Sequence, residues 1–463
     1  MFRVFAATIA LLSGSITAVS AQEAESYLHT GPVSVMADEH TTSFFNHLNE
    51  SNNTLYEAIS MAYENNPTAR AARAELLAVE EQLEQAKSGY RPTISADGDI
   101  THTDTDTQGQ SFITSDGANT SKSGALNLSQ PLFRGGTTAA DISGARNSIT
   151  AQSLSLSATE QNIIYEAATA YMDVLQTKAI LELNEKNYNL VSKELEQAQN
   201  RFTVGEVTRT DVSQSEARLA AANANIITAK ASFKSAIAVY RRIIGSPPPI
   251  DMAYPEKLFD LPDNLDEAIS ISQTNNREVL QAKFINAAAE DNVDSVFGEL
   301  MPQVTAKGSL NKSYDPSDFI EEQRQTSIGI MASIPLYQAG STRSRIREAK
   351  KRANQRYIQI LEAQNRAKQE TISNWEELEA AKAETVAREA QINAARIAQE
   401  GVHYETEFGE RTTLDALDAN QELLDAQVGL VTAKRNEIVA RFALGRSLGL
   451  LVPQNFGFSS ITP

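Results

Sequence analysis

The chain has 463 residues and contains no cysteine. This absence excludes a disulfide framework, a thiolate metal site, a cysteine nucleophile and a lipidated cysteine. Beyond the N-terminal residues there is no apolar run of about 18 residues, so we predict no transmembrane helix. The formal net charge of −18 argues against a protein that binds nucleic acid.

Recognisable catalytic motifs are also missing. The five histidines are scattered along the chain, and no HExxH, Walker or GxSxG pattern occurs. The glycine pair at Gly135 and Gly136 is typical of a turn rather than of a phosphate cradle. We therefore expect a protein that is not an enzyme and that uses no cofactor.

The N-terminus has the three parts of a secretory signal peptide. In residues 1–21, MFRVFAATIALLSGSITAVSA, a basic Arg3 precedes a short apolar core and a small-residue site with expected cleavage after Ala21. A short buried helix is the alternative. Residues 22–52 are polar and weakly patterned, so we expect a flexible mature N-terminus.

Similar segments recur along the chain at a nearly constant spacing. TLYEAISMAYENNP from Thr54 resembles NLDEAISISQTNNR from Asn264, which is an offset of 210 positions. From the corners SQPLFRGG and SIPLYQAG onward, which contain Pro131 and Pro335, the offset is 204. One length difference between Pro92 and Pro131 accounts for the change. We therefore predict an internal duplication, with repeats at 53–245 and 262–449, a proline-rich linker at 246–261 and a tail at 450–463.

Each repeat is predicted to contain a helix, two strands, a very long helix and a return helix. The first helix is expected at about Leu55–Gly89. Strands are expected at about 91–104, 121–131, 302–313 and 324–335, where apolar and polar residues alternate. This alternation fits a half-buried strand of a soluble sheet, and it also fits a membrane barrel strand with its apolar face towards lipid.

The long helices are expected at about 137–204 and 341–408. At about 1.5 Å per residue, each would span about 100 Å. Apolar residues at heptad spacing, such as Val174, Leu181 and Tyr188, indicate coiled-coil packing. A compact domain cannot cover a helix of this length, so we expect partner helices along it. Four strands cannot close a barrel, and open edges in lipid are costly, so two chains with eight strands or three with twelve are both allowed.

Several motifs together resemble TolC-type outer-membrane efflux proteins. They are the repeated LxEAI motif, the SQPLFRGG and SIPLYQAG corners, and the turns RFTVGEVTRTDV and EFGERTTLDALDA. The resemblance covers about residues 53–452. It implies an α+β membrane protein in which a trimer forms a twelve-stranded transmembrane β-barrel, four strands per protomer. This barrel is continued by a periplasmic α-helical coiled-coil barrel.

The family also implies a function and partners. Such proteins are passive exit ducts in the outer membrane of Gram-negative cells, in contact with outer-membrane lipid. They dock a periplasmic adaptor, or membrane fusion protein, and an inner-membrane RND or ABC transporter. The setting is either multidrug efflux or type I secretion, and no residue decides between them. The alternative from the residues alone is a periplasmic coiled-coil adaptor or scaffold without a channel.

The two helix–turn–helix points are expected to be the periplasmic ends. From the residues alone, Gly205 supplies a tight turn, Thr210 or Asp211 can cap the returning helix, and Asp211 with Gln214 fits a capping box. By resemblance, these turns also contact the adaptor. The expected contacts are Val204, Gly205, Glu206, Val207, Phe408, Gly409 and Glu410.

The resemblance assigns a periplasmic gate to four charged residues. Asp211 and Arg411 match the family's charged constriction between helices, and Asp415 and Asp418 match its acidic entrance ring. We expect multivalent cations to block this ring, although a solvated helix start favoured by the helix dipole is the simpler interpretation. The family's constriction tyrosine is replaced by Thr406. The strand–helix corners are expected at Pro131, Gly135, Gly136, Pro335 and Gly340.

Overall fold

The computed structural model describes residues 54–106, 117–255, 258–317 and 320–456. All of them belong to the unit of the chain that begins at Asn53. The predicted signal peptide, the segment 22–52 and residues 457–463 of the predicted tail lie outside the described residues.

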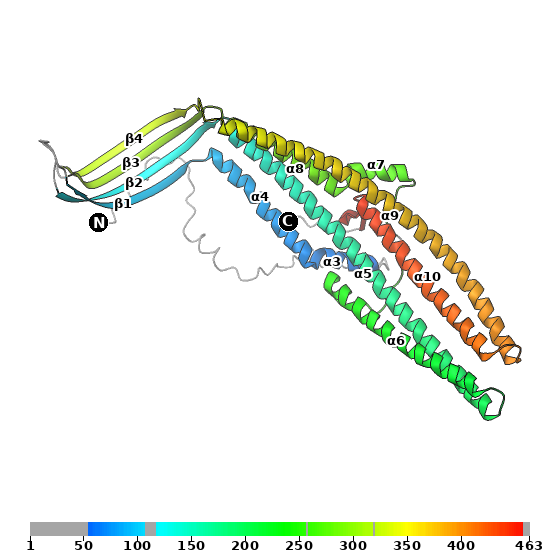
Figure 1. Cartoon of the computed structure of the whole chain (residues 1–463). Coiled ribbons are helices and arrows are strands. Elements are labelled where there is room, and N and C mark those ends of the chain that lie inside the picture. The colour runs from blue at the N-terminus through cyan, green and yellow to red at the C-terminus, as the bar shows by residue number, and fades with distance from the viewer. Residues whose placement is uncertain (1–53, 107–116, 256–257, 318–319, 457–463) are drawn as a thin grey trace, which may run out of the picture. The chain divides into compact units, whose positions relative to one another are not determined.

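Two sets of elements follow one another in the same order, helix–helix–strand–strand–long helix–return helix (Figure 1). The first set is α3 (Thr54–Asn65), α4 (Pro67–Lys87), β1 (Thr93–Thr105), β2 (Gly117–Arg134), α5 (Thr137–Thr203) and α6 (Arg209–Ile244). The second set is α7 (Leu265–Asn275), α8 (Arg277–Gly298), β3 (Gln303–Ser317), β4 (Ile320–Ser333), α9 (Ser341–Glu407) and α10 (Thr413–Ser447).

The single helix expected at Leu55–Gly89 is wrong, because the structure has two helices there. Asn66 has an extended backbone, and its side-chain oxygen accepts a hydrogen bond from the Thr68 amide at 2.8 Å. Pro67 then occupies the first turn of α4, where its missing N–H leaves no bond unmade. The chain therefore stops one helix and starts another at a single residue.

The four strands form one antiparallel sheet in the order β1-β2-β3-β4. Leu126 pairs with Leu310, and Ala306 pairs with Ile330, so the apolar positions of neighbouring strands lie on the same face. That face is open to the surroundings: Ile328 is 92% exposed and Ile330 is 72% exposed. Within the described chain, β1 and β4 each pair on one side only. The sheet thus has an uncovered apolar face and two unpaired edges.

The strand ends differ from expectation at both prolines. β2 continues past Pro131 to Arg134 with an irregular register between Pro131 and Phe133, whereas β4 ends at Ser333, before Pro335. β1 pairs with β2 only as far as Ser129. At Pro131 the strand therefore has one neighbour, and proline is tolerated in such an edge position.

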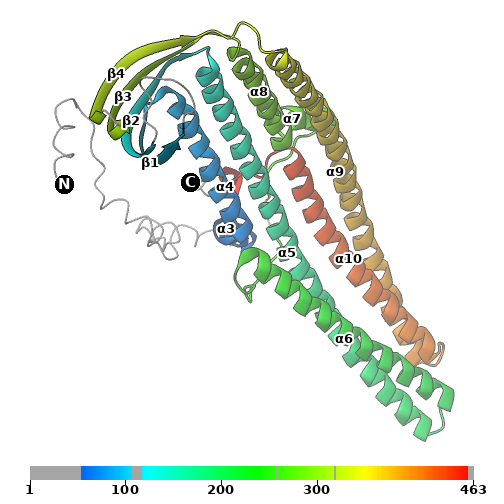
Figure 2. The same cartoon turned by 60° about the vertical axis from the view of Figure 1, so that its left-hand side comes forward.

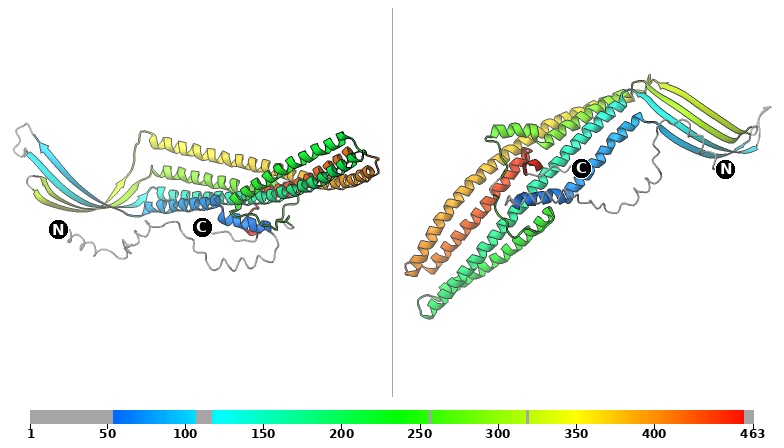
Figure 3. Two further views of the ribbon diagram at one scale, coloured as in Figure 1. Left: turned by 90° about the horizontal axis from the view of Figure 1, so that it is seen from below. Right: turned by 180° about the vertical axis from the view of Figure 1, so that it is seen from behind.

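Long helices run on directly from the sheet. α5 and α9 have 67 residues each, which at about 1.5 Å per residue is about 100 Å. Near the sheet, α4, α5, α8 and α9 pack side by side in that order; further along, α6 packs on α5 and α10 packs on α9 (Figures 2 and 3). α10 also contacts α5, so the two antiparallel helix pairs are joined. No helix in the described ranges is both long and apolar enough to cross a membrane.

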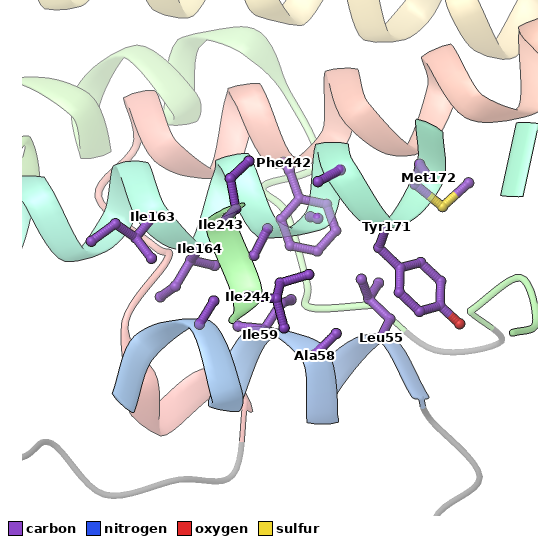
Figure 4. Packing of buried hydrophobic residues seen from close by; sticks show 14 of the residues in the cluster. Leu55, Ala58, Ile59, Ile163, Ile164, Tyr171, Met172, Ile243, Ile244 and Phe442 are labelled. Atoms are coloured by element: carbon purple, nitrogen blue, oxygen red, sulfur yellow. The ribbon is translucent and has the colours of Figure 1, made fainter. Parts of the chain in front are cut away.

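The main hydrophobic core lies where α6 and α10 end against α3 and the middle of α5 (Figure 4). Tyr171, Tyr240 and Phe442 are fully buried there. The Tyr171 hydroxyl donates to the Ala253 carbonyl at 2.9 Å and accepts from its amide at 3.1 Å, so the buried polar atom is satisfied. This core anchors the helices at mid-length, and the turns at their far ends project beyond it.

Candidate functional site

The turns between α5 and α6 and between α9 and α10 share one backbone geometry. Gly205 and Gly409 have φ angles of 84° and 79°, in the left-handed region that favours glycine. The Glu206 amide bonds the Arg201 carbonyl at 2.9 Å, and the Glu410 amide bonds the Glu405 carbonyl at 2.8 Å. Both helices therefore end in a Schellman-type turn that satisfies their last carbonyls.

Each return helix starts with a capping box. The Thr208 amide and hydroxyl donate to Asp211 at 2.8 Å each, and the Asp211 amide donates back to the Thr208 hydroxyl at 3.3 Å. Thr412 and Asp415 repeat this arrangement. The expected cap at Thr210 or Asp211, with Gln214 closing the box, is wrong: the helix begins earlier, at Arg209, and Asp211 is its third residue.

These hydrogen bonds fix the charge of both aspartates. The Thr208 backbone N–H and then its hydroxyl lower the pKa of Asp211 from its usual value. The Thr412 hydroxyl and then its backbone N–H lower the pKa of Asp415 in the same way. Both carboxylates are therefore ionised at neutral pH and have a structural partner within their own turn.

The two turns hold ion pairs of opposite polarity. Arg201 at the end of α5 bonds Glu206 of its turn at 3.2 Å, and Glu405 at the end of α9 accepts from Arg411 of its turn at 2.9 Å. Arg201 and Glu405 are 204 positions apart, so equivalent helix positions have opposite charges. Arg411 is thus held by Glu405 at the end of α9. In the described residues of one chain, it makes no ion pair with Asp211.

Asp418 forms an ion pair with Arg218 of α6, which the sequence reasoning missed. The pair joins the two helix pairs close to their turns, and both side chains are about half exposed. Nothing in the sequence links these positions, which are 200 residues apart. In the described residues, no group of three or more histidine, aspartate or glutamate side chains is placed to hold a metal ion.

A second missed contact lies beside this ion pair, because Asn420 is two residues from Asp418 on α10. Glu194 of α5 is buried and accepts a hydrogen bond from the Asn420 side chain of α10, and Gln399 of α9 donates to Asn420 at 2.8 Å. Burial raises the pKa of Glu194, with the Asn420 hydrogen bond and His403 opposing the shift. The second carboxylate oxygen of Glu194 is buried without a hydrogen-bond partner. Asn420 therefore connects α5, α9 and α10, and the burial of the Glu194 carboxylate carries an electrostatic cost.

The expected adaptor-contact residues are exposed at the turns, except for Val207, which is half-buried. Val204 is 70% exposed and Phe408 is 80% exposed, and they occupy equivalent positions beside the two turn glycines. Tyr404, near the unmatched Thr406, is also exposed, whereas the Thr406 hydroxyl donates to the Val402 carbonyl at 2.7 Å. Each turn thus presents a highly exposed apolar side chain next to charged groups.

The corners between sheet and helices depend on glycine. A Cβ at Gly135 would lie 2.2 Å from the Gly298 carbonyl oxygen, so only glycine fits there. Gly136 and Gly340 precede α5 and α9 with φ angles of 87° and 81°. Beyond β4, Leu336 and Tyr337 are largely exposed. Apolar side chains therefore surround the point where the helices leave the sheet.

Comparisons with known proteins find similar sequences over most of the chain. A family model described as "Outer membrane efflux protein" matches residues 58–246 and again residues 268–450. The chain is 34% identical over 407 residues to the outer membrane efflux protein BepC of Brucella suis, covering 87% of each chain. It is 24% identical over 438 residues to the outer membrane protein TolC of Escherichia coli, covering 89% of this chain and 85% of that one.

The fold also matches solved structures. The structure of the outer membrane protein VceC of Vibrio cholerae superimposes with a TM-score of 0.73 at 20% identity, covering 85% of this chain and 96% of that one. At this identity the likeness concerns the fold alone.

Proposed function

Because the chain belongs to the outer membrane efflux protein family, whose members are channels of the outer membrane that extend into the periplasm, we propose that it is the exit duct of a tripartite export system. In this role it receives material from an inner-membrane RND or ABC transporter and a periplasmic adaptor. It then conducts this material passively across the periplasm and the outer membrane.

One observation supports the proposal above all: a sheet with an exposed apolar face continues directly into helices about 100 Å long. Lipid would cover the apolar face, and neighbouring chains would pair the two open edges, since unpaired edges do not persist in lipid. Three copies would supply twelve strands from four each, and the duplicated half of the chain would then recur six times around the duct. In a periplasmic scaffold, this apolar face would be exposed to water, with no lipid to cover it.

The gate of the proposed duct lies at the turns. In a trimer, Asp415 would recur three times around the axis close to Asp418, and such clustered carboxylates attract cations. Arg218 neutralises part of this charge within each chain. We further propose that Asp211 and Arg411 form the constriction by approaching each other between chains, because each is free to add a second partner to its local one.

The exposed Val204 and Phe408 support the proposal that the turns dock the adaptor. Apolar side chains beside tight turns can insert into a partner's groove, and the ion pairs Arg201–Glu206 and Glu405–Arg411 keep the flanking charges in place. Glu206 makes the first turn more polar than a purely apolar docking site.

Conductance in planar lipid bilayers tests the duct directly. Purified protein should form discrete, ion-conducting channels that require outer-membrane-like lipid or detergent for stability. A folded oligomer that never conducts would contradict the proposal. A deletion strain then separates the two settings: loss of efflux raises sensitivity to toxic compounds, whereas loss of secretion removes proteins from the medium.

A further inference from the structure

The four-helix layer next to the sheet has an inner seam between α5 and α8 and two open sides. α5 and α8 pack together inside the chain, whereas α4 and α9 are the outer helices of the layer, each with one neighbour in it. α5 and α9 have the same length, and their bounds differ by 204 positions; Asn66 and Asn276, which cap α4 and α8, differ by 210. Adding 204 to a residue number of α5 therefore gives the equivalent residue of α9, and subtracting 210 from a residue number of α8 gives the equivalent residue of α4. Each contact of the inner seam then corresponds to one pair of residues on α9 and α4.

The inner seam is held by a few definite contacts. The Asn147 side-chain amide donates to the Asp291 carboxylate at 2.6 Å. A Cβ at Gly144 would lie 3.5 Å from the Asp291 Cβ, which is ordinary van der Waals contact. The Ser295 hydroxyl donates to Asp141 at 2.6 Å. These contacts fix the register of one helix against the other.

The equivalent positions on the open sides have opposite charges. Asn147 maps to Lys351 on α9, and Asp291 maps to Glu81 on α4. The Lys351 and Glu81 side chains are exposed, and neither makes an ion pair within the described residues of one chain. Gly144 maps to Glu348, whose carboxylate is already paired with Arg352 at 2.7 Å. An amide–carboxylate hydrogen bond inside the chain is thus replaced by a lysine and a glutamate on its two outer sides.

We propose that α9 of one copy packs against α4 of a second copy in the register of the inner seam, with the Lys351 ammonium donating to Glu81 of that copy. This inference rests on the proposed oligomeric duct and names the interface that builds it. The contact joins two different surfaces of the same chain, so it is head-to-tail, and repetition closes a ring if the rotation per copy allows it.

The sheet supports the same register. Leu126 opposite Leu310 maps to Ile330 opposite Ile100 of the next copy. Leu128 opposite Gly308 maps to Ala332 opposite Gly98. The apolar face of β4 would therefore continue without interruption onto β1 of the next copy. A shift of one residue would instead place polar side chains of β1 beside Ile330.

Charge reversal with rescue tests the ion pair. Lys351→Glu and Glu81→Lys should each lower the temperature at which the detergent-solubilised oligomer dissociates, because each places like charges in the seam. The double variant should restore most of the loss. Lys350→Glu is the matched control, since it makes the same charge change on a neighbouring exposed residue and should have a smaller effect. No rescue in the double variant would overturn the Lys351–Glu81 pair.

Because the chain has no cysteine, a disulfide can report the register without any background reaction. The Cβ separation of 3.5 Å between positions 144 and 291 lies at the short end of the disulfide range of about 3.5–4.5 Å. Glu348→Cys with Glu81→Cys should therefore crosslink neighbouring copies, giving a ladder on a non-reducing gel. Gly144→Cys with Asp291→Cys should form the same bond within one chain and give no ladder.

The outcomes separate this inference from the proposed function. A wild-type protein that is folded but monomeric in detergent and in membranes would contradict the oligomeric duct itself. A stable, conducting oligomer with no charge rescue and no ladder from positions 348 and 81 would leave the duct intact and overturn the register.

Discussion

Arg218 of α6 and Asp418 of α10 form an ion pair that joins the two helix pairs just before their separate turns. The contact matters because it links α6 and α10 near the tips, while along its length α10 also packs against α5 and α9. It holds together two tips that the main core, at mid-length, does not reach.

In the proposed duct, removal of Arg218 should therefore loosen the contact between the two tips of each chain. An exposed ion pair contributes about 0.2–1 kcal/mol, so three pairs in a trimer shift a closed–open equilibrium severalfold or more. We expect Arg218→Ala to raise single-channel conductance in planar bilayers. Arg209→Ala removes a similar charge from the start of the same helix and should leave conductance unchanged. Equal conductance in both variants would count against a role of the Arg218–Asp418 ion pair in holding the tips together.

The proposed constriction can be separated from helix capping. Asp211→Ala with Arg411→Ser should raise conductance, because it removes both charges proposed to meet between chains. Asp211 also caps α6, however, and loss of a cap costs about 1 kcal/mol. Thr208→Ala removes the same cap and leaves both charges in place. If this single variant raised conductance as much as the double variant does, the effect would belong to the cap.

Block by multivalent cations tests the acidic entrance. Asp415→Ala with Asp418→Ala should abolish block from the periplasmic side, while Asp425→Ala, at an exposed position further along α10, should not. The Thr412 hydroxyl and backbone N–H lower the pKa of Asp415, so this carboxylate loses its charge only as the pH falls below the ordinary aspartate value of about 3.9. Block should therefore keep its strength between about pH 8 and pH 5. Block that persists in the double variant would place the cation site elsewhere.

Glu194 should make the junction of α5, α9 and α10 sensitive to pH. Burial raises the pKa of Glu194, so the folded state favours its protonated form. The stability from this preference is present below the ordinary glutamate pKa and is lost as the pH rises through the raised value. Glu194→Gln keeps an oxygen for the Asn420 amide and cannot ionise, so it should raise the melting temperature at about pH 8 and change it little at low pH.

The matched control for this prediction is Glu196→Gln, an exposed position on the same helix. It should leave the melting temperature unchanged at both pH values. Thermal unfolding of the detergent-solubilised protein provides the measurement. A Glu194→Gln variant that melts with the same pH dependence as the wild type would show that the carboxyl group is not the source of that dependence.

Local pattern predicts the long elements well and the contacts between them poorly. α5 and α9 begin after Gly136 and Gly340 and end beside Val204 and Phe408, because glycine and the turn sequence fix both ends within a few residues. The cap of α6 was predicted wrongly because two threonines, Thr208 and Thr210, precede Asp211. Only the Thr208 hydroxyl accepts a hydrogen bond from the backbone amide of Asp211, the third residue of the helix.

Contacts such as Arg218–Asp418 and Glu194–Asn420 follow from how α10 lies across α5 and α6. That crossing depends on the whole core, and no spacing within one helix encodes it. The equivalent positions of Arg218 and Asp418 in the other half of the chain are Glu422 and Gln214, so the repeat supplies no signal either. Sequence alone therefore places the turns and leaves their partners undetermined.

The corner between β2 and α5 offers a test of assembly in which two adjacent glycines serve as each other's control. Gly135→Ala forces a Cβ to within 2.2 Å of the Gly298 carbonyl, in addition to the strain of a φ angle of 65°. Gly136→Ala has a φ angle of 87° but nothing within 4 Å of the added carbon. A left-handed non-glycine residue costs about 1–2 kcal/mol.

Both variants bear this backbone cost, and only Gly135→Ala must also move α8 away from the start of α5. We therefore expect Gly135→Ala to reduce the yield of detergent-stable oligomer much more than Gly136→Ala does. Size-exclusion chromatography with light scattering measures that yield. Equal yields would mean that the close approach of Gly135 to Gly298 is not needed, and that the helices can leave the sheet with a wider corner.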